Sequence, residues 1–371
     1  MISKTIQRVR WKLIGLYQNS RLQISLLWLF SRSKVLSSIW FLFSGALGRE
    51  HQAVLYGRHR HLTEKREHSL NGAIYTLRRN THRIEKGLIM RPRRDVFAVA
   101  YIEETVRMFK SVKQDDFHKV NSADLISWSQ DVLTEYFDIA GAHPKIESAK
   151  SIFSSVSTHV TPTGKATASE SVEAKKPYLR NLEDHACVSI DQLEKLAWLR
   201  RSCRWFLAKP VPRDLIDRAL AVACMAPSAC NRQPFEFRIF DDPDLVKQVA
   251  SIPGGTSGFY HNFPCVAAIV GDMSAFPFDR DRHVPYIDAS LAAMGFQFAL
   301  EVQGISSCCI NWPDVKGKER AVGKQLGLAA DQRVIMMMAI GYPDPTGQVP
   351  YSQKKSLDEL RSYNQTTNQD R

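Results

Sequence analysis

The chain has 371 residues, 44% of them hydrophobic and 24% charged, which excludes a disordered chain with too little apolar material for a core. The formal net charge of +12 is unevenly distributed. Residues 1–120 contain 23 basic and 9 acidic residues, a net charge of +14, so the remainder carries −2. This imbalance favours an acidic partner for the N-terminal region, either anionic lipid or nucleic acid, over a merely solvated face.

Residues 1–49 contain eight Lys and Arg residues and no Asp or Glu. Apolar residues spaced by four and three predict an amphipathic helix whose basic side chains lie off the apolar face: Ile2, Ile6, Val9, Leu13 and Leu16. Such a helix is typical of an anionic membrane interface. A docking helix is the alternative, and fewer than three heptads disfavour a coiled coil.

Two apolar stretches follow, at 22–30 and 35–47, with Arg32 and Lys34 between them. A single spanning helix would place both cations near the bilayer centre, at about 2.5–3.5 kcal/mol each. A signal peptide is a further reading, which the long basic start and the interruption disfavour. We expect helices that lie on a membrane surface or pack on the rest of a cytoplasmic protein, peripheral to the inner face of the membrane.

The next segment, 50–150, is expected to be helical, with two apolar stripes: Ile74, Leu77, Thr81, Ile84 and Leu88, then Val99, Ile102, Val106 and Phe109. The mixed charges of residues 82–88 predict a solvated helix face that ends at Gly87 as its C-cap. Residues 151–184 are interpreted as a Ser/Thr-rich linker, 185–363 as a second domain and 364–371 as a polar tail.

The second domain mixes helices and strands. Residues 215–226 form a helical stripe that stops at Pro227, and 235–239 alternate as in a half-buried strand. Residues 264–270 and 334–340 are short apolar runs, consistent with buried strands. Residues 286–303 predict an apolar helix that must be buried, against another subunit if not within the chain. Its expected face carries Ile287, Leu291, Met294 and Phe298. The pattern predicts an α+β or α/β fold.

Four segments are candidates for chemistry. Arg200, Arg201, Ser202 and Arg204 could grip a phosphate, because guanidinium groups and a hydroxyl donate hydrogen bonds to its oxygens; a basic helix end is the alternative. Residues 226–234 lie between a helix and a strand and could offer donors and acceptors to a flavin pyrimidine edge, or could be an ordinary turn. The candidates in that segment are Ser228, Asn231 and Gln233.

The third segment, 304–313, could lie flat against a flavin ring or be a plain buried strand; it holds Ser307, Ile310 and Asn311. The fourth, with Lys354 and Lys355, could return to the phosphate or be a solvated tail. Seven cysteines without CxxC spacing, two of them adjacent at 308–309, indicate buried thiols in a reducing compartment. No metal site, GxGxxG or phosphate-binding loop motif is found.

The order and spacing of "RRSxRxF", "APSxxNxQP", a helix beginning "YxD", "GxxSCxxNW" and a closing lysine pair resemble the FMN-dependent nitroreductase family. The resemblance covers roughly residues 195–361 and implies a nitroreductase-like mixed sheet flanked by helices. It also implies a flavin at the interface of an intertwined homodimer. In that dimer Arg200, Ser202 and Arg204 would clamp the phosphate with Lys354 or Lys355.

The resemblance further implies that Ser228, Asn231 and Gln233 face the ring or ribityl chain, and that the 307–311 backbone passes near the reactive nitrogen. The segment "LRRNTHRIEKGL" resembles an extension found on a branch of the family near polysaccharide-synthesis genes. We expect hydride transfer from NAD(P)H through FMN to an electron-poor small-molecule acceptor. No catalytic acid or base is identified, because Asp288 fits a helix cap or dipole partner better. The rivals are an inactive scaffold at a membrane surface and, less favoured, a nucleic-acid-binding protein.

Overall fold

The computed structural model describes residues 21–67, 70–115, 122–157, 174–181, 183 and 187–364. The expected amphipathic helix at 2–16, most of the expected linker and nearly all of the polar tail lie outside these residues. The helices before the sheet are α2 (Arg21–Ser31), α3 (Lys34–Ser44), α4 (Gly48–Glu67), α5 (Leu70–Leu88), α6 (Ile102–Gln114), α8 (Ala123–Ile139) and α9 (Pro144–Ser157).

Residues 187–364, here the sheet domain, carry four strands and six α-helices. The strands are β1 (Phe235–Phe240), β2 (Cys265–Asp272), β3 (Ser306–Asn311) and β4 (Gln332–Gly341). The helices are α10 (Ile190–Leu199), α11 (Arg213–Ala223), α12 (Pro243–Ala250), α13 (Val284–Val302), α14 (Lys316–Leu326) and α15 (Leu357–Leu360). Short 3-10 turns lie between them, among them η1 (Ala229–Asn231) and η3 (Met273–Ala275).

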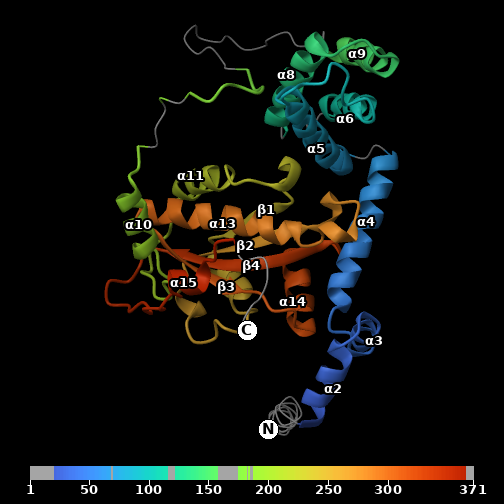
Figure 1. Ribbon diagram of the computed structural model, residues 1–371. Helices are drawn as coiled ribbons and strands as arrows, with labels where there is room; N and C mark the ends of the chain where they lie inside the picture. The colour runs from blue at the N-terminus through green and yellow to red at the C-terminus, as the bar shows by residue number, and fades with distance from the viewer. Residues whose placement is uncertain are drawn as a thin grey trace.

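The sheet has the order β1-β2-β4-β3, so β1 and β3 are its two edges. All three pairings are antiparallel, with Ile269 opposite Phe237 and Met336, and Met336 opposite Asn311. A parallel pairing is found in the isolated bridge between Ser202 and Ser307. The predicted α+β architecture, a sheet flanked by helices and preceded by a helical N-terminal region, is confirmed (Figure 1).

The alternation of side chains along β2 explains why both faces of the sheet are covered. Val266, Ala268 and Val270 pack with α12 and α14, whereas Cys265, Ala267 and Ile269 pack with α11 and α13. Every residue from 265 to 270 is at most 1% exposed. The central strand is therefore a continuous apolar run buried between two helical layers.

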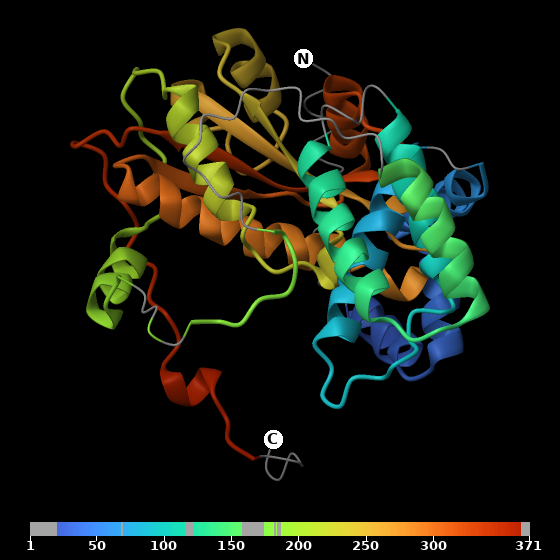
Figure 2. The same cartoon turned by 90° about the horizontal axis from the view of Figure 1, so that it is seen from above.

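Helices α5, α6, α8 and α9 form a separate helical bundle with its own core, which includes Leu77, Ile84, Val106 and Phe109. The predicted stripes are confirmed, but α6 begins only at Ile102, after Ala98 with its positive φ of 60°. The linker prediction was wrong at its start, because α9 continues to Ser157 and buries Phe153 and Val156. Figure 2 shows the bundle over one end of the sheet domain.

Two expectations for residues 82–88 were wrong. Gly87 is not a left-handed C-cap; it lies in the last turn of α5, where an added Cβ would collide with the ring of Phe97. The segment is not a solvated face either, because Glu85 accepts a hydrogen bond from Trp128 Nε1 at 2.8 Å and Arg83 lies over the Tyr101 ring at 3.8 Å. Packing against α6 and α8, rather than water, satisfies these polar groups.

Helix α4 connects the bundle to the sheet domain through a buried ion-pair network. Arg333 on β4 is 1% exposed and pairs with Glu50 of α4 at 3.0 Å, and with Asp314 and Glu319. Arg60 of α4 pairs with Asp331 at 3.0 Å. A buried cation without partners is costly, so these carboxylates fix α4 against the sheet.

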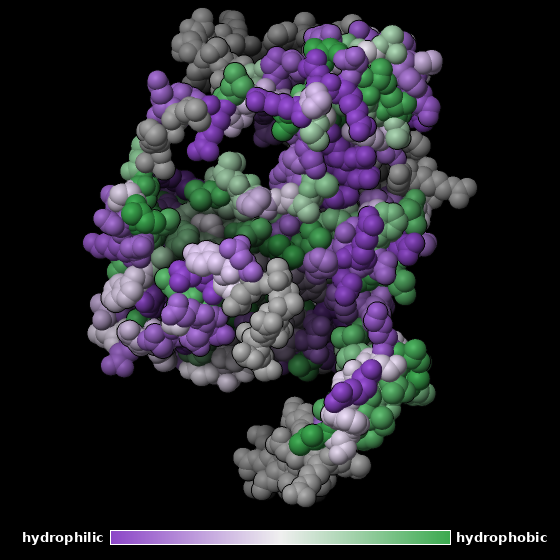
Figure 3. All heavy atoms as spheres, viewed as in Figure 1, coloured by the Kyte–Doolittle hydropathy of each residue, from purple (hydrophilic) through white to green (hydrophobic). Residues whose placement is uncertain are grey.

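Helices α2 and α3, here the N-terminal arm, project away from the rest of the molecule (Figures 1 and 3). They break at residues 32–33, where Ser33 caps α3 by accepting from Val35 N. Many apolar side chains of the arm are exposed, among them Phe43 at 84% and Leu42 at 76%. No helix among the described residues is long and apolar enough to span a membrane.

Candidate flavin site

The first group of predicted site residues follows α10 on an extended segment. Ser189 and Gln192 form a capping box at the start of α10, and the helix ends at Arg200. Ser202 then bridges to Ser307 of β3, and Cys203 N donates to Ser307 O at 3.1 Å. The backbone pairing therefore brings the Arg-Ser-x-Arg segment to the β3 edge of the sheet.

A cavity of about 270 Å³ joins this segment to β3. Arg204 lines it together with Cys308, Cys309, Ile310 and Asn311. The Arg204 guanidinium lies 5.8 Å from the Phe259 ring centroid and donates to Ser202 O at 3.3 Å. A cation and a strand edge in one cavity can hold an anionic group at one end and a flat ring at the other.

Two polar atoms at this edge are buried and have no hydrogen-bond partner among the described residues: Arg200 Nε and Ser307 Oγ. Ser307 is 1% exposed. A buried polar group without a partner costs about 1–3 kcal/mol, and such groups are uncommon in native proteins. Both groups are free to donate hydrogen bonds to the oxygen atoms of an anionic group.

The electrostatics of the edge are set by Arg200 and Arg204. Burial raises the pKa of the Cys308 thiol, while Arg204 and a hydrogen bond with Ser202 act in the opposite direction. Burial also raises the pKa of Glu301, partly offset by Ser306 and Arg200. The expectation of buried thiols holds for Cys203, Cys265 and Cys308. It was wrong for Cys187, Cys224 and Cys309, which are exposed, and Cys230 is half-buried.

Of the twelve predicted site residues, Arg204, Ile310 and Asn311 line this cavity and the other nine do not. Arg201 turns back to α10, with its guanidinium 5.2 Å from the Trp198 ring centroid. Lys354 and Lys355 lie in the segment 348–364, in which every residue is exposed. Figure 2 shows this segment, here the C-terminal arm, extending away from the sheet.

The second group of predicted residues forms a strained turn before β1. Ser228 Oγ donates to Asp288 Oδ2 at 2.6 Å, and Gln233 N donates to Ser228 Oγ at 2.8 Å. Gln233 Nε2 donates to Asn231 Oδ1 at 2.9 Å. Cys230, Asn231 and Gln233 have φ near 52–53°, which costs energy for side chains other than glycine and is found mostly at functional sites.

The structure does not bring the two groups together within one chain. The turn leads into β1, whereas the segment with Arg200, Ser202 and Arg204 pairs with β3. These two strands are opposite edges of the sheet. Three interstrand spacings separate them, about 14 Å. Asp288, 3% exposed on α13, holds the turn and is not near the cavity lining.

Sequence reasoning missed the far wall of the cavity, which consists of Gly254, Gly255 and Thr256. Thr256 Oγ1 donates to Ala250 O at 2.9 Å and fixes this loop. The Lys318 Nζ lies against Gly254, close to the position that a Cβ would occupy, so a second cation lies close to the cavity. The adjacent glycines at 254–255 could have predicted a close-packed loop at a site, whereas no sequence pattern indicated Lys318.

Residues 199–255 and 246–342 match the nitroreductase family. This match includes both candidate groups apart from the closing lysine pair. The iodotyrosine deiodinase 1 of Rattus norvegicus is 22% identical over 189 residues, 43% of this chain and 65% of that protein, so the chain spans less than two thirds of its length. A candidate NADH dehydrogenase/NAD(P)H nitroreductase of Archaeoglobus fulgidus is 25% identical over 157 residues, 42% of this chain and 87% of that protein.

Among solved structures, an FMN-dependent nitroreductase from Clostridium difficile R20291 is similar to the nitroreductase-like part. It has a TM-score of 0.40 and 22% identity, and the likeness covers 46% of this chain and 98% of that one.

Proposed function

We propose that the protein is an FMN-dependent oxidoreductase that passes hydride from NAD(P)H to an electron-poor small molecule. The observation that carries the proposal is the pair of unpartnered buried groups, Arg200 Nε and Ser307 Oγ, beside the cavity that Arg204 lines. Phosphate oxygens accept charge-assisted hydrogen bonds from such groups. The residues present therefore fit the phosphate end of FMN.

Bound FMN supplies the hydride-transfer chemistry, and the chain's own residues bind and orient it. Arg200, Ser202 and Arg204 would hold the phosphate, joined by Lys354 or Lys355 from the exposed C-terminal arm. The backbone of 307–311 would support the ring at the β3 edge. We assign no catalytic acid or base to the chain.

We propose that the working unit is a homodimer. The cavity of about 270 Å³ is smaller than the 300–1,000 Å³ usual for small-molecule sites, so a second wall is needed. In a dimer the strained turn of one chain, with Ser228, Asn231 and Gln233, could complete the site of the other. The outer face of α13 supports this, because Ile287, Leu291 and Met294 are 50%, 45% and 37% exposed.

The absorbance spectrum of the purified protein tests the flavin proposal. We expect flavin bands, and consumption of NADH or NADPH when an acceptor is added. Because relatives are named as a nitroreductase and a deiodinase, the acceptors should include a nitroaromatic compound and an iodinated tyrosine. Colourless protein that ignores added FMN would contradict the proposal and favour the inactive scaffold.

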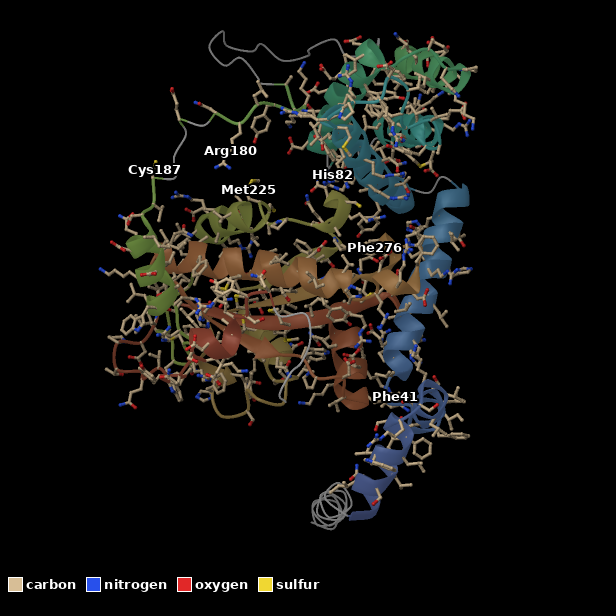
Figure 4. The ribbon with its side chains drawn as sticks, viewed as in Figure 1. Phe41, His82, Arg180, Cys187, Met225 and Phe276 are labelled. Carbon is tan, nitrogen blue, oxygen red and sulfur yellow. The ribbon has the colours of Figure 1, made fainter. Side chains whose placement is uncertain are left out.

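The N-terminal arm supports a second proposal, peripheral attachment to an anionic membrane. Ile24, Trp28 and Phe43 are 60%, 59% and 84% exposed on helices that project from the rest of the chain (Figure 3). Figure 4 shows Phe41 on the same arm. The basic residues nearby would add attraction to anionic lipid of about 1 kcal/mol each close to the surface.

A further inference from the structure

A second cavity, of about 550 Å³, lies between the helical bundle and the sheet domain. Tyr75 and Arg78 of α5 line one side, and Arg232 and Gln233 of the strained turn line the other. Its volume is within the range of small-molecule sites. The cavity shares no lining residue with the one at β3.

The cavity lining also includes the carboxylates of Glu236 and Asp272. Asp272 accepts hydrogen bonds from Tyr75 Oη at 3.0 Å and from Ser274 Oγ at 2.6 Å. Glu236 accepts from Arg238 Nε at 2.7 Å. Neither carboxylate pairs with Arg78 or Arg232 among the described residues.

Two arginines of the cavity lack an acidic partner. Arg78 and Arg232 form no salt bridge with a described residue, although Arg232 is only 7% exposed. Arg232 instead lies 4.7 Å from the Phe276 ring centroid, and Figure 4 shows Phe276 beside α4. Arginine stays protonated at any pH that proteins tolerate, so the half-buried Arg78 and the buried Arg232 each bring a positive charge to the cavity lining.

Burial lowers the pKa of Arg78, and it lowers the pKa of Arg232 in the same way. Arg79 of α5 lies close enough to lower the pKa of Arg232 further by charge repulsion. The cavity lining therefore offers two guanidinium groups that have lost part of their hydration. An anion bound in the cavity would replace some of that hydration.

We propose that this cavity is a binding site for the carboxylate or phosphate group of a small molecule, held by Arg78 and Arg232. The proposal that this cavity binds an anion does not depend on flavin binding. As the site for the acceptor's anionic group it rests on the proposed function, since Gln233 belongs both to this cavity and to the turn expected at the partner's flavin. The acceptor is then an electron-poor organic anion.

Isothermal titration calorimetry on FMN-saturated full-length protein at low ionic strength tests the site. The probes are inorganic phosphate and succinate, which separate the two anion classes. We expect saturable binding of at least one probe, weakened tenfold or more in Arg78→Gln and in Arg232→Gln. Arg218→Gln is the matched control, because Arg218 is an exposed arginine on α11 that does not line the cavity.

FMN affinity is measured in the same variants. Unchanged FMN affinity of Arg78→Gln together with weaker probe binding supports a separate anion site. The proposal is overturned if neither probe saturates, if Arg78→Gln binds like the control, or if FMN affinity falls in parallel with probe affinity. Failure of FMN to bind the unaltered protein would instead remove the acceptor assignment, and the same titrations without FMN would still decide the anion site.

Discussion

The hydroxyl of Ser228 donates a hydrogen bond of 2.6 Å to Asp288 Oδ2, and the same carboxylate oxygen accepts Ala229 N at 3.0 Å. One buried side chain of α13 thereby holds a turn in which three non-glycine residues have positive φ. The turn is strained, so it depends on this anchor.

Removal of the anchor should destabilise the turn. We expect Asp288→Ala to lower the free energy of unfolding by about 1–3 kcal/mol, because Ser228 and Ala229 lose their acceptor. Asp288→Asn should cost less, since it keeps one acceptor oxygen. Urea unfolding measures both. Asp217→Ala, an exposed carboxylate on α11, is the control, and equal stability of the Asp288 and Asp217 variants would show that the anchor is dispensable.

The phosphate assignment predicts the effect of removing Arg204. We expect Arg204→Ala to weaken FMN binding about 10- to 100-fold, because a hydrogen bond to a charged group contributes about 1.5–3 kcal/mol. Arg201→Ala should change affinity much less, since Arg201 packs on Trp198. Titration of apo-protein with FMN measures both. Unchanged affinity in Arg200→Ala, Ser202→Ala and Arg204→Ala alike would refute the assignment.

The buried Asp331 should make stability depend on pH. Burial, and then the neighbouring Asp272, raise the pKa of Asp331, although Arg60 acts in the opposite direction. Because the pKa is higher in the folded state, Asp331 contributes fully to the free energy of unfolding below the unfolded pKa of about 3.9. This contribution is lost as pH rises through the folded pKa. The free energy of unfolding of wild type minus that of Asp331→Asn should therefore fall as pH rises over that window.

Asp344 provides the opposite case for comparison in urea unfolding at several pH values. Thr346 donates two hydrogen bonds to it and lowers the pKa of its carboxyl. Asp344 therefore contributes to the free energy of unfolding above its unfolded pKa, and this contribution is lost as pH falls through the folded pKa. The difference in free energy of unfolding between wild type and Asp344→Asn should rise with pH, opposite to that for Asp331→Asn. Parallel pH profiles of the two variants would contradict the assignment.

The homodimer proposal predicts that a charge on the outer face of α13 separates the chains. We expect Leu291→Arg to shift the protein to monomer and to weaken FMN binding, because the site would lose its second wall. Light scattering gives the mass. Leu245→Arg is the matched control, because Leu245 on α12 is 41% exposed, close to the 45% of Leu291. A flavin-loaded monomer of the unaltered chain would remove the dimer from the proposal.

The membrane proposal predicts that charges on the N-terminal arm reduce vesicle binding. We expect the double variant Leu42→Glu and Phe43→Glu to co-sediment less with phosphatidylglycerol vesicles than the unaltered protein, because both side chains are exposed and apolar. High salt should weaken binding only in part, since screening affects charges and not apolar insertion. Met225→Glu, exposed at 81% elsewhere, is the control. Equal binding to neutral vesicles would remove the electrostatic contribution.

The sequence alone determined most of the elements, and it predicted a phosphate-binding segment at residues 200–204. Alternation predicted β1, apolar runs predicted β2 and β4, and the stripe from Ile74 to Leu88 predicted α5. Periodicity succeeds here because it records which side of an element is buried. It does not record what lies against that side, so the prediction that Gly87 is the C-cap of α5 was wrong.

Only the tertiary structure decided how the candidate residues are distributed. Sheet order placed the turn of Ser228 and the bridge of Ser202 at opposite edges, although both come from one sequence pattern. Packing of α4 and α5 on the sheet domain paired Glu50 with Arg333 and placed Arg78 and Arg232 in the lining of one cavity, across sequence separations that no local pattern encodes. Local propensity acts over a few residues, whereas burial of charge and closure of a cavity depend on which distant surfaces meet.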